Sequence, residues 1–212
     1  GLAVVCAVTG NRFYATMSEG NSRARARMME QLGANVISVP QVDGTPGKVT
    51  GADIRAATEK AILLAQELGG FYVDQFNNGS GLTAHYETTG PEIWDALGNR
   101  IGAFVAAVGT SGTFTGVSRF LKEKNKKILC APVEPEGSEI IAGKPIVKPG
   151  HVLQGTGYGL VPPHFDHAVT DRFLAVSDEE ATHYKNILAQ KEGLYAGFSA
   201  GANVCAAVKL LE

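Results

Sequence analysis

The feature that most constrains this sequence is a run of small and apolar residues that leads into a glycine-rich turn. Residues 103–108 have the composition of a buried strand, and an amphipathic run from Phe114 to Lys124 has the period of a helix. Between them lies Gly109-Thr110-Ser111-Gly112-Thr113. Such a turn presents unpaired backbone N–H groups at the positive end of a helix, with hydroxyl groups beside them. We therefore predict that it binds a phosphate group.

The turn alone leaves the kind of phosphate open. The lysine of a nucleotide-hydrolysing loop is missing, because Thr113 follows Gly112. The spacing of Gly109, Gly112 and Gly116 is not that of a dinucleotide-binding fingerprint, yet Glu134 ends the next apolar run, where an acid can take a ribose hydroxyl. A nicotinamide-dependent oxidoreductase and a tight turn that binds nothing both stay open at this point.

Composition narrows the class of protein. The 212 residues are 44% hydrophobic and 19% charged, with a formal net charge of −2, which is typical of a globular domain and gives no basic surface for nucleic acid. Apolar runs are too short to cross a membrane. The three cysteines are far apart in apolar surroundings, which indicates free thiols in the cytoplasm. His164, Asp166 and His167 do not have the spacing of a zinc site, so we expect no bound metal.

The order of predicted elements indicates an α/β fold with parallel sheets. Helices and strands alternate through the first third of the chain, at residues 1–9, 12–17, 23–32, 35–39, 52–68 and 71–73. The polar run 77–81 marks a boundary, so we predict lobes at 1–78 and 79–212. The second lobe is predicted to contain a helix over 82–97 that is interrupted or restarted at Gly90-Pro91, a strand over 128–133, a helix capped by Ser177 and Glu180, and a helix over 202–211.

Seven separated motifs occur together in this chain. They are Gln75-Phe76-Asn77, His85-Tyr86-Glu87-Thr88-Thr89-Gly90-Pro91-Glu92-Ile93-Trp94, Gly109-Thr110-Ser111-Gly112-Thr113, Val133-Glu134-Pro135, Lys148-Pro149-Gly150-His151, Gln154-Gly155-Thr156-Gly157 and Gly193-Leu194-Tyr195-Ala196-Gly197-Phe198-Ser199-Ala200-Gly201. In this order they resemble the cysteine synthase (O-acetylserine sulfhydrylase) and cystathionine β-synthase family of fold-type II pyridoxal-phosphate enzymes. The resemblance covers nearly the whole chain. It implies two three-layer lobes with parallel sheets, as in the tryptophan synthase β-subunit, with the first lobe truncated and the second lacking its last segment.

The resemblance also assigns roles to particular residues. Gly109, Thr110, Ser111, Gly112 and Thr113 would hold the phosphate of pyridoxal 5′-phosphate, with Ser111 standing where glycine is more usual. Ser199 would meet the pyridine nitrogen, Gln75 would lie near the substrate carboxylate, and Gly155 would lie beside the cofactor face. Glu134 becomes a structural acid at a strand end, and His85 a structural histidine. We expect Gln75, Gly109 and Ser199 to gather at the carboxyl ends of strands.

The implied activity is a β-replacement in cysteine biosynthesis, in which O-acetylserine and sulfide give cysteine, catalysed by a cytoplasmic homodimer of the transferase or lyase class. The family's Schiff-base lysine lies in a Ser-x-Lys-x-Arg motif before a Ser-Gly-Asn-Thr-Gly loop, and neither motif occurs in these residues. We therefore expect a partial chain that cannot form the Schiff base by itself. A catalytically silent member that keeps the phosphate loop as a binding module is the alternative.

Overall fold

The computed structural model describes residues 1–47 and 49–212, which form two compact units, 1–73 and 74–212. The first unit has two parallel strands that pair in register from Tyr14 with Asn35 to Ser18 with Val39. Its elements in chain order are α1 (Leu2–Thr9), β1 (Tyr14–Ser18), α2 (Arg23–Gln31), β2 (Asn35–Val39) and α3 (Gly51–Leu68). Helix α3 is joined to β1 by a hydrogen bond from Thr16 Oγ1 to the Ala57 carbonyl, at 2.8 Å.

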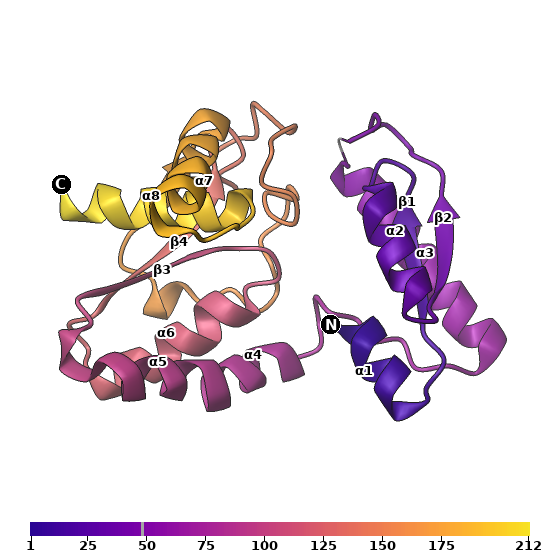
Figure 1. Ribbon diagram of the computed structural model, residues 1–212, viewed down its shortest axis with the longest axis horizontal. Coiled ribbons are helices and arrows are strands. Elements are labelled where there is room, and N and C mark those ends of the chain that lie inside the picture. Colours follow the sequence, from indigo (N-terminus) through magenta and orange to yellow (C-terminus); the bar gives the residue numbers. More distant parts are fainter. Residues whose placement is uncertain (48) are drawn as a thin grey trace. The chain divides into compact units, whose positions relative to one another are not determined.

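The second unit has three layers, with a parallel sheet between two groups of helices (Figure 1). The strands lie in the order β3, β4, β5, and all their pairings are parallel. The elements are α4 (Ser80–Ala84), the π-helix η1 (His85–Thr89), α5 (Gly90–Leu97), the 3-10 helix η2 (Gly98–Arg100), β3 (Ala103–Ala107), α6 (Gly112–Lys124), β4 (Leu129–Pro135), the 3-10 helix η3 (His167–Val169), β5 (Leu174–Val176), α7 (Asp178–Glu192) and α8 (Phe198–Leu211).

Each face of this sheet has its own apolar core. On one face, Phe114, Val117 and Leu121 of α6 pack with Ile128 and Cys130, and Trp94 of α5 lies against this cluster. On the other face, Val133 and Val176 of the sheet pack with Ala181 of α7 and with Ala202 and Cys205 of α8. Since apolar burial is the main stabilising contribution to folding, these two clusters hold the sheet that carries the glycine turn from both faces.

The predicted α/β class with parallel sheets is confirmed, and several element boundaries are corrected. The strand predicted over 71–73 is wrong, because this segment pairs with none of the described strands. The helix predicted over 82–97 begins at Ser80, passes through the π-helix and continues as α5 from Gly90. Helix α6 begins at Gly112, and α8 begins at Phe198, which is earlier than the predicted 202. Strand β5 has only three residues and was not predicted.

Candidate functional site

The glycine turn connects the end of β3 to the start of α6, as predicted. The strand is extended by a hydrogen bond from the Val108 N–H to the Val133 carbonyl, and the helix is opened by one from the Thr115 N–H to the Ser111 carbonyl. The N–H groups of the first helical turn, those of Gly112 and Thr113 among them, have no acceptor within a helix. These N–H groups and the positive end of the helix dipole favour an anion at the turn.

Two other backbone segments lie close against the glycines of this turn, and at Gly109 the nearer one leaves no room for a side chain. A Cβ atom added to Gly109 would lie 2.6 Å from the carbonyl oxygen of Gly155, and one added to Gly112 would lie 3.3 Å from the carbonyl carbon of Gly81. The structure therefore places Gly155 directly beside the turn. Gly155 itself has a φ of 99°, a conformation that glycine adopts most readily.

The three hydroxyl groups of the turn have different environments. Ser111 is buried, and its Oγ lies 2.9 Å from Thr115 Oγ1, so its hydroxyl bonds to the first turn of α6. Thr110 is half-buried, and Thr113 is exposed. The Oγ1 atom of Thr113 lies 3.0 Å from Nε2 of His85, a residue of the π-helix. Thr113 therefore offers an accessible hydroxyl whose position is fixed by its contact with the His85 ring.

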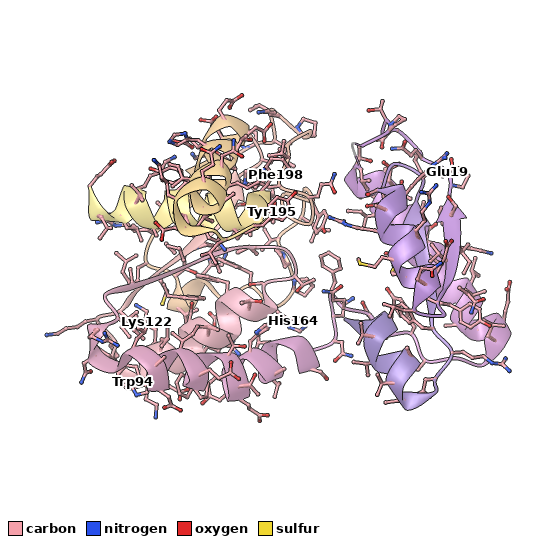
Figure 2. All side chains as sticks on the ribbon, in the orientation of Figure 1. Glu19, Trp94, Lys122, His164, Tyr195 and Phe198 are labelled. Carbon is pink, nitrogen blue, oxygen red and sulfur yellow. The ribbon has the colours of Figure 1, made fainter. Side chains whose placement is uncertain are left out.

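Ser199 lies in the first turn of α8 and is half-buried. Four residues further along the helix, the Oδ1 atom of Asn203 accepts a hydrogen bond of 2.8 Å from the backbone N–H of Ala107, the last residue of β3. A helix rises about 6 Å over four residues, so this bond fixes the beginning of α8 relative to the end of β3. Figure 2 shows Phe198 and Tyr195 at the same end of the helix, and Tyr195 is 97% exposed.

Gln75 is exposed and lies in a turn, whereas it was expected to follow a strand. The turn is closed by hydrogen bonds from the backbone N–H groups of Asn77 and Asn78 to the Asp74 carbonyl. The neighbouring Phe76 ring makes an edge contact with Tyr158 at a centroid distance of 5.6 Å. This contact attaches the Gln75 turn to the segment that contains Gly155.

Glu134 is a structural acid, as the family resemblance implied, and its oxygens are not available to a ribose. Its Oε1 accepts a hydrogen bond from the Ile141 N–H at 2.8 Å, and its Oε2 accepts one from the Ala142 N–H at 3.0 Å. Burial raises the pKa of this carboxyl above its usual range, although both backbone N–H groups act against the rise. The carboxyl group anchors the segment after β4.

Asp166 and His167, which were considered as metal ligands from the sequence, contact other side chains. Asp166 accepts hydrogen bonds from the Arg119 guanidinium, the shorter at 2.7 Å, and one from the Ala168 N–H. The His167 ring makes an edge contact with Phe165 at a centroid distance of 4.8 Å. Among residues 1–47 and 49–212, no group of three acidic, histidine or cysteine side chains is placed to hold a metal ion.

The sequence did not predict the contacts that other segments make with the glycine turn and its neighbours. Asn203 is four residues after Ser199, a spacing that puts both on one side of a helix, and this was the available signal. His85 and Thr89 have the same spacing, but nothing in their local pattern points to Thr113. Tyr158 and Gly81 gave no signal, because their contacts join segments that are distant in the chain.

A parallel three-layer unit with a glycine turn between β3 and α6 is the class of structure to which the comparisons also point. The family model described as "Pyridoxal-phosphate dependent enzyme" matches residues 1–212, and the chain belongs to that family. Cysteine synthase A of Escherichia coli (strain K12) is 38% identical over 100% of this chain and 65% of its own length. The O-acetylserine dependent cystathionine β-synthase of Bacillus subtilis (strain 168) is 37% identical over 99% of this chain and 64% of its own length.

Solved structures agree with the sequence relatives. The O-acetylserine dependent cystathionine β-synthase of Helicobacter pylori superposes with a TM-score of 0.87 at 36% identity, covering 99% of this chain and 65% of that one. An O-ureido-L-serine synthase gives a TM-score of 0.87 at 31% identity, with 99% and 63% covered. The chain thus spans about 65% of the length of the curated relatives. None of its helices, among the residues described, is long and apolar enough to cross a membrane.

Proposed function

We propose that the protein catalyses a pyridoxal-phosphate-dependent β-replacement of the cysteine synthase type, in which an O-activated serine such as O-acetylserine reacts with sulfide to give cysteine. Family membership and the names of the relatives support the reaction class. The single observation that carries the proposal is the glycine turn after β3, which combines free N–H groups, an accessible threonine hydroxyl and a glycine, Gly109, that has no room for a side chain.

These features fit the cofactor phosphate. In the proposed site, the backbone of Gly109, Thr110, Ser111 and Gly112 surrounds the phosphate, and Thr113 donates its hydroxyl hydrogen to it. Each hydrogen bond to a charged group contributes about 1.5–3 kcal/mol, and the helix dipole adds about 0.3–1 kcal/mol. The absence of a lysine in the turn is compatible with this role, since the N–H groups supply the positive end of a dipole.

Ser199 is proposed to meet the pyridine nitrogen, and Asn203 holds its helix in place. Pyridoxal phosphate, when bound, supplies an electron-accepting ring that activates bonds at the substrate α- and β-carbons. A neutral serine hydroxyl does not keep the ring nitrogen protonated as a carboxylate does, which weakens the ring as an electron acceptor. This favours elimination and replacement at the β-carbon over transamination. Gln75 and Gly155 are proposed to contact the substrate from the segments joined by Phe76 and Tyr158.

The partners follow from the same proposal. The substrates are an activated amino acid and sulfide or a thiol, and the protein is proposed to be a cytoplasmic homodimer. Light scattering after size-exclusion chromatography tests the dimer. Assays with O-acetylserine, O-phosphoserine or serine as the donor, and with sulfide or homocysteine as the acceptor, identify the substrate pair by whether cysteine or cystathionine forms.

The decisive test is the mass of the purified protein with pyridoxal phosphate, measured before and after borohydride reduction, followed by an assay for cysteine. The proposal expects one reduced pyridoxyl group, and the formation of cysteine from O-acetylserine and sulfide, for a chain that contains the family's lysine motif, and no adduct for residues 1–212 alone. A stable adduct on that chain without turnover of any donor would indicate a binding module and not an enzyme, and the absence of a specific adduct on that chain would refute the cofactor assignment. The missing motif predicts that no lysine within these 212 residues carries the adduct, which peptide mapping checks.

A further inference from the structure

The His85 imidazole stands between two threonine hydroxyls in the second unit. Its Nε2 lies 3.0 Å from Thr113 Oγ1, and its Nδ1 lies 3.0 Å from Thr89 Oγ1. Thr113 ends the glycine turn, whereas Thr89 is the last residue of the π-helix to which His85 belongs. Both nitrogens of the ring are therefore used, and both contacts are to groups that can donate or accept.

The close approach of two helical segments puts the ring in this place. A Cβ atom added to Gly116 of α6 would lie 2.6 Å from the Leu82 carbonyl oxygen and 3.0 Å from His85 Cβ. Only glycine permits this separation, and it brings the ring within hydrogen-bond distance of the first turn of α6. The N–H of Gly90 bonds to the His85 carbonyl, which gives the π-helical turn. Such turns interrupt α-helices frequently at functional sites.

Hydrogen counting limits the possible arrangements. A neutral imidazole has one nitrogen that donates and one that accepts, and a threonine hydroxyl has a single hydrogen. If Nε2 accepts, the Thr113 hydrogen is spent on the ring and none is left for a phosphate. If Nε2 carries the hydrogen, Thr113 Oγ1 accepts it and its own hydrogen is free to point outward. Nδ1 then accepts from the Thr89 hydroxyl, so all three groups are satisfied.

We propose that His85 is a positioning residue that donates through Nε2–H to Thr113 and thereby directs the Thr113 hydroxyl hydrogen toward the bound phosphate. Thr89 sets the tautomer by donating to Nδ1. This inference rests on the proposed phosphate role of the turn and adds a residue that does not touch the phosphate. No proton is transferred, because the arrangement only orients hydrogens.

The test compares two probes on the purified protein and its variants. Pyridoxine 5′-phosphate has the ring and the phosphate but no aldehyde, and pyridoxine lacks the phosphate. Calorimetry measures the affinity for pyridoxine 5′-phosphate, and ligand-observed NMR measures the weaker affinity for pyridoxine. His85→Leu is expected to weaken pyridoxine 5′-phosphate binding about two- to tenfold, the value of one ordinary hydrogen bond, and to leave pyridoxine binding unchanged. His85→Gln places an amide N–H near the Nε2 position and is expected to restore most of the affinity.

A double variant distinguishes an effect of His85 through the Thr113 hydroxyl from an effect of His85 on packing. If His85 acts through Thr113, then His85→Leu has no further effect in the Thr113→Val background. Equal losses for both probes, additive losses in the double variant, or no loss in His85→Leu would overturn the inference. Wild-type protein that binds pyridoxine 5′-phosphate no better than pyridoxine would instead refute the phosphate role of the turn.

A direct measurement covers the case in which the leucine variant does not fold. Two-dimensional ¹H–¹⁵N NMR of the histidine side chains distinguishes the Nε2–H from the Nδ1–H tautomer in the unmodified protein. The inference expects His85 as the Nε2–H tautomer with pyridoxine 5′-phosphate bound, and Thr89→Val to relax that preference. The Nδ1–H tautomer in the bound protein would contradict it.

Discussion

Ser111 has a backbone conformation that residues other than glycine rarely adopt. Its φ is 72°, in the left-handed region, and it lies at the residue before α6. This conformation costs an L-residue about 1–2 kcal/mol relative to the right-handed one. The bond between Ser111 Oγ and Thr115 Oγ1 offsets part of that cost. Such strain is common where a backbone is shaped to hold a ligand.

Two substitutions separate the strain from the hydrogen bond. Both Ser111→Ala and Ser111→Gly remove the bond to Thr115, but only glycine relieves the left-handed conformation. We expect the glycine variant to be more stable than the alanine variant by about 1 kcal/mol, after allowing for the greater freedom of glycine in the unfolded chain. Urea unfolding followed by circular dichroism measures the difference. An alanine variant more stable than the glycine variant would show that the turn is not strained.

At the scale of residues, the sequence predicts local chemistry better than distant contacts. The glycine turn and the strand-end position of Glu134 follow from composition and spacing, and the structure has both. The partners of Thr113 and Ala107 come from residues 28 and 96 positions away. Hydrogen bonds of that kind depend on how whole helices pack, which periodicity does not encode.

Helices α7 and α8 show how a glycine sets the distance between two elements. A Cβ atom added to Gly201 of α8 would lie 2.1 Å from the Ala181 carbonyl oxygen and 2.6 Å from the Lys185 N atom, both in the backbone of α7. Neither atom can move without displacing its helix. Gly201 therefore lets α8 approach α7 closely, with Ser199 two residues before this contact.

The same substitution at two helical glycines is expected to have opposite effects. Gly201→Ala should destabilise the protein by about 1–3 kcal/mol, because the methyl group has no space. Gly81→Ala is the matched control, since no atom lies within 4 Å of its added Cβ, and it should be neutral or stabilise by up to about 1 kcal/mol. Thermal unfolding of both variants tests the pair. Equal effects would mean that α7 moves away from α8 at little cost.

Helices that carry capping residues in their own sequence were predicted more closely than strands that form only by pairing with a neighbouring strand. Ser177 and Glu180 form the reciprocal capping box expected at the start of α7, with hydrogen bonds of 3.1 and 2.9 Å. The strand predicted over 71–73 failed because apolar composition does not make a strand without a pairing neighbour. Strand β5 was missed for the converse reason, since its three residues become a strand only by pairing with β4.

At the scale of the whole molecule, burial is distributed unevenly between the two units. Both apolar cores belong to the second unit, at the two faces of its sheet. In the first unit, the buried hydrophobic residues among those described are Ala3 and Ala34. Small side chains of this kind contribute little apolar area, so we expect the first unit to have the lower free energy of unfolding.

This difference predicts two separable unfolding transitions. Trp94 is the single tryptophan of the chain and lies in α5 against the core of the second unit, so its fluorescence reports that unit. Amide exchange measured across a urea series should show β1 and β2 opening at lower urea than the fluorescence transition.

The residues proposed to hold the cofactor phosphate all lie in the second unit, and a ligand stabilises only the state that binds it. Pyridoxine 5′-phosphate at about 100 times its dissociation constant should therefore raise the free energy of unfolding of the second unit by about 2.7 kcal/mol and leave β1 and β2 unchanged. One coincident transition for both units would show that they unfold together. An equal shift in β1 and β2 would show that the first unit also takes part in binding.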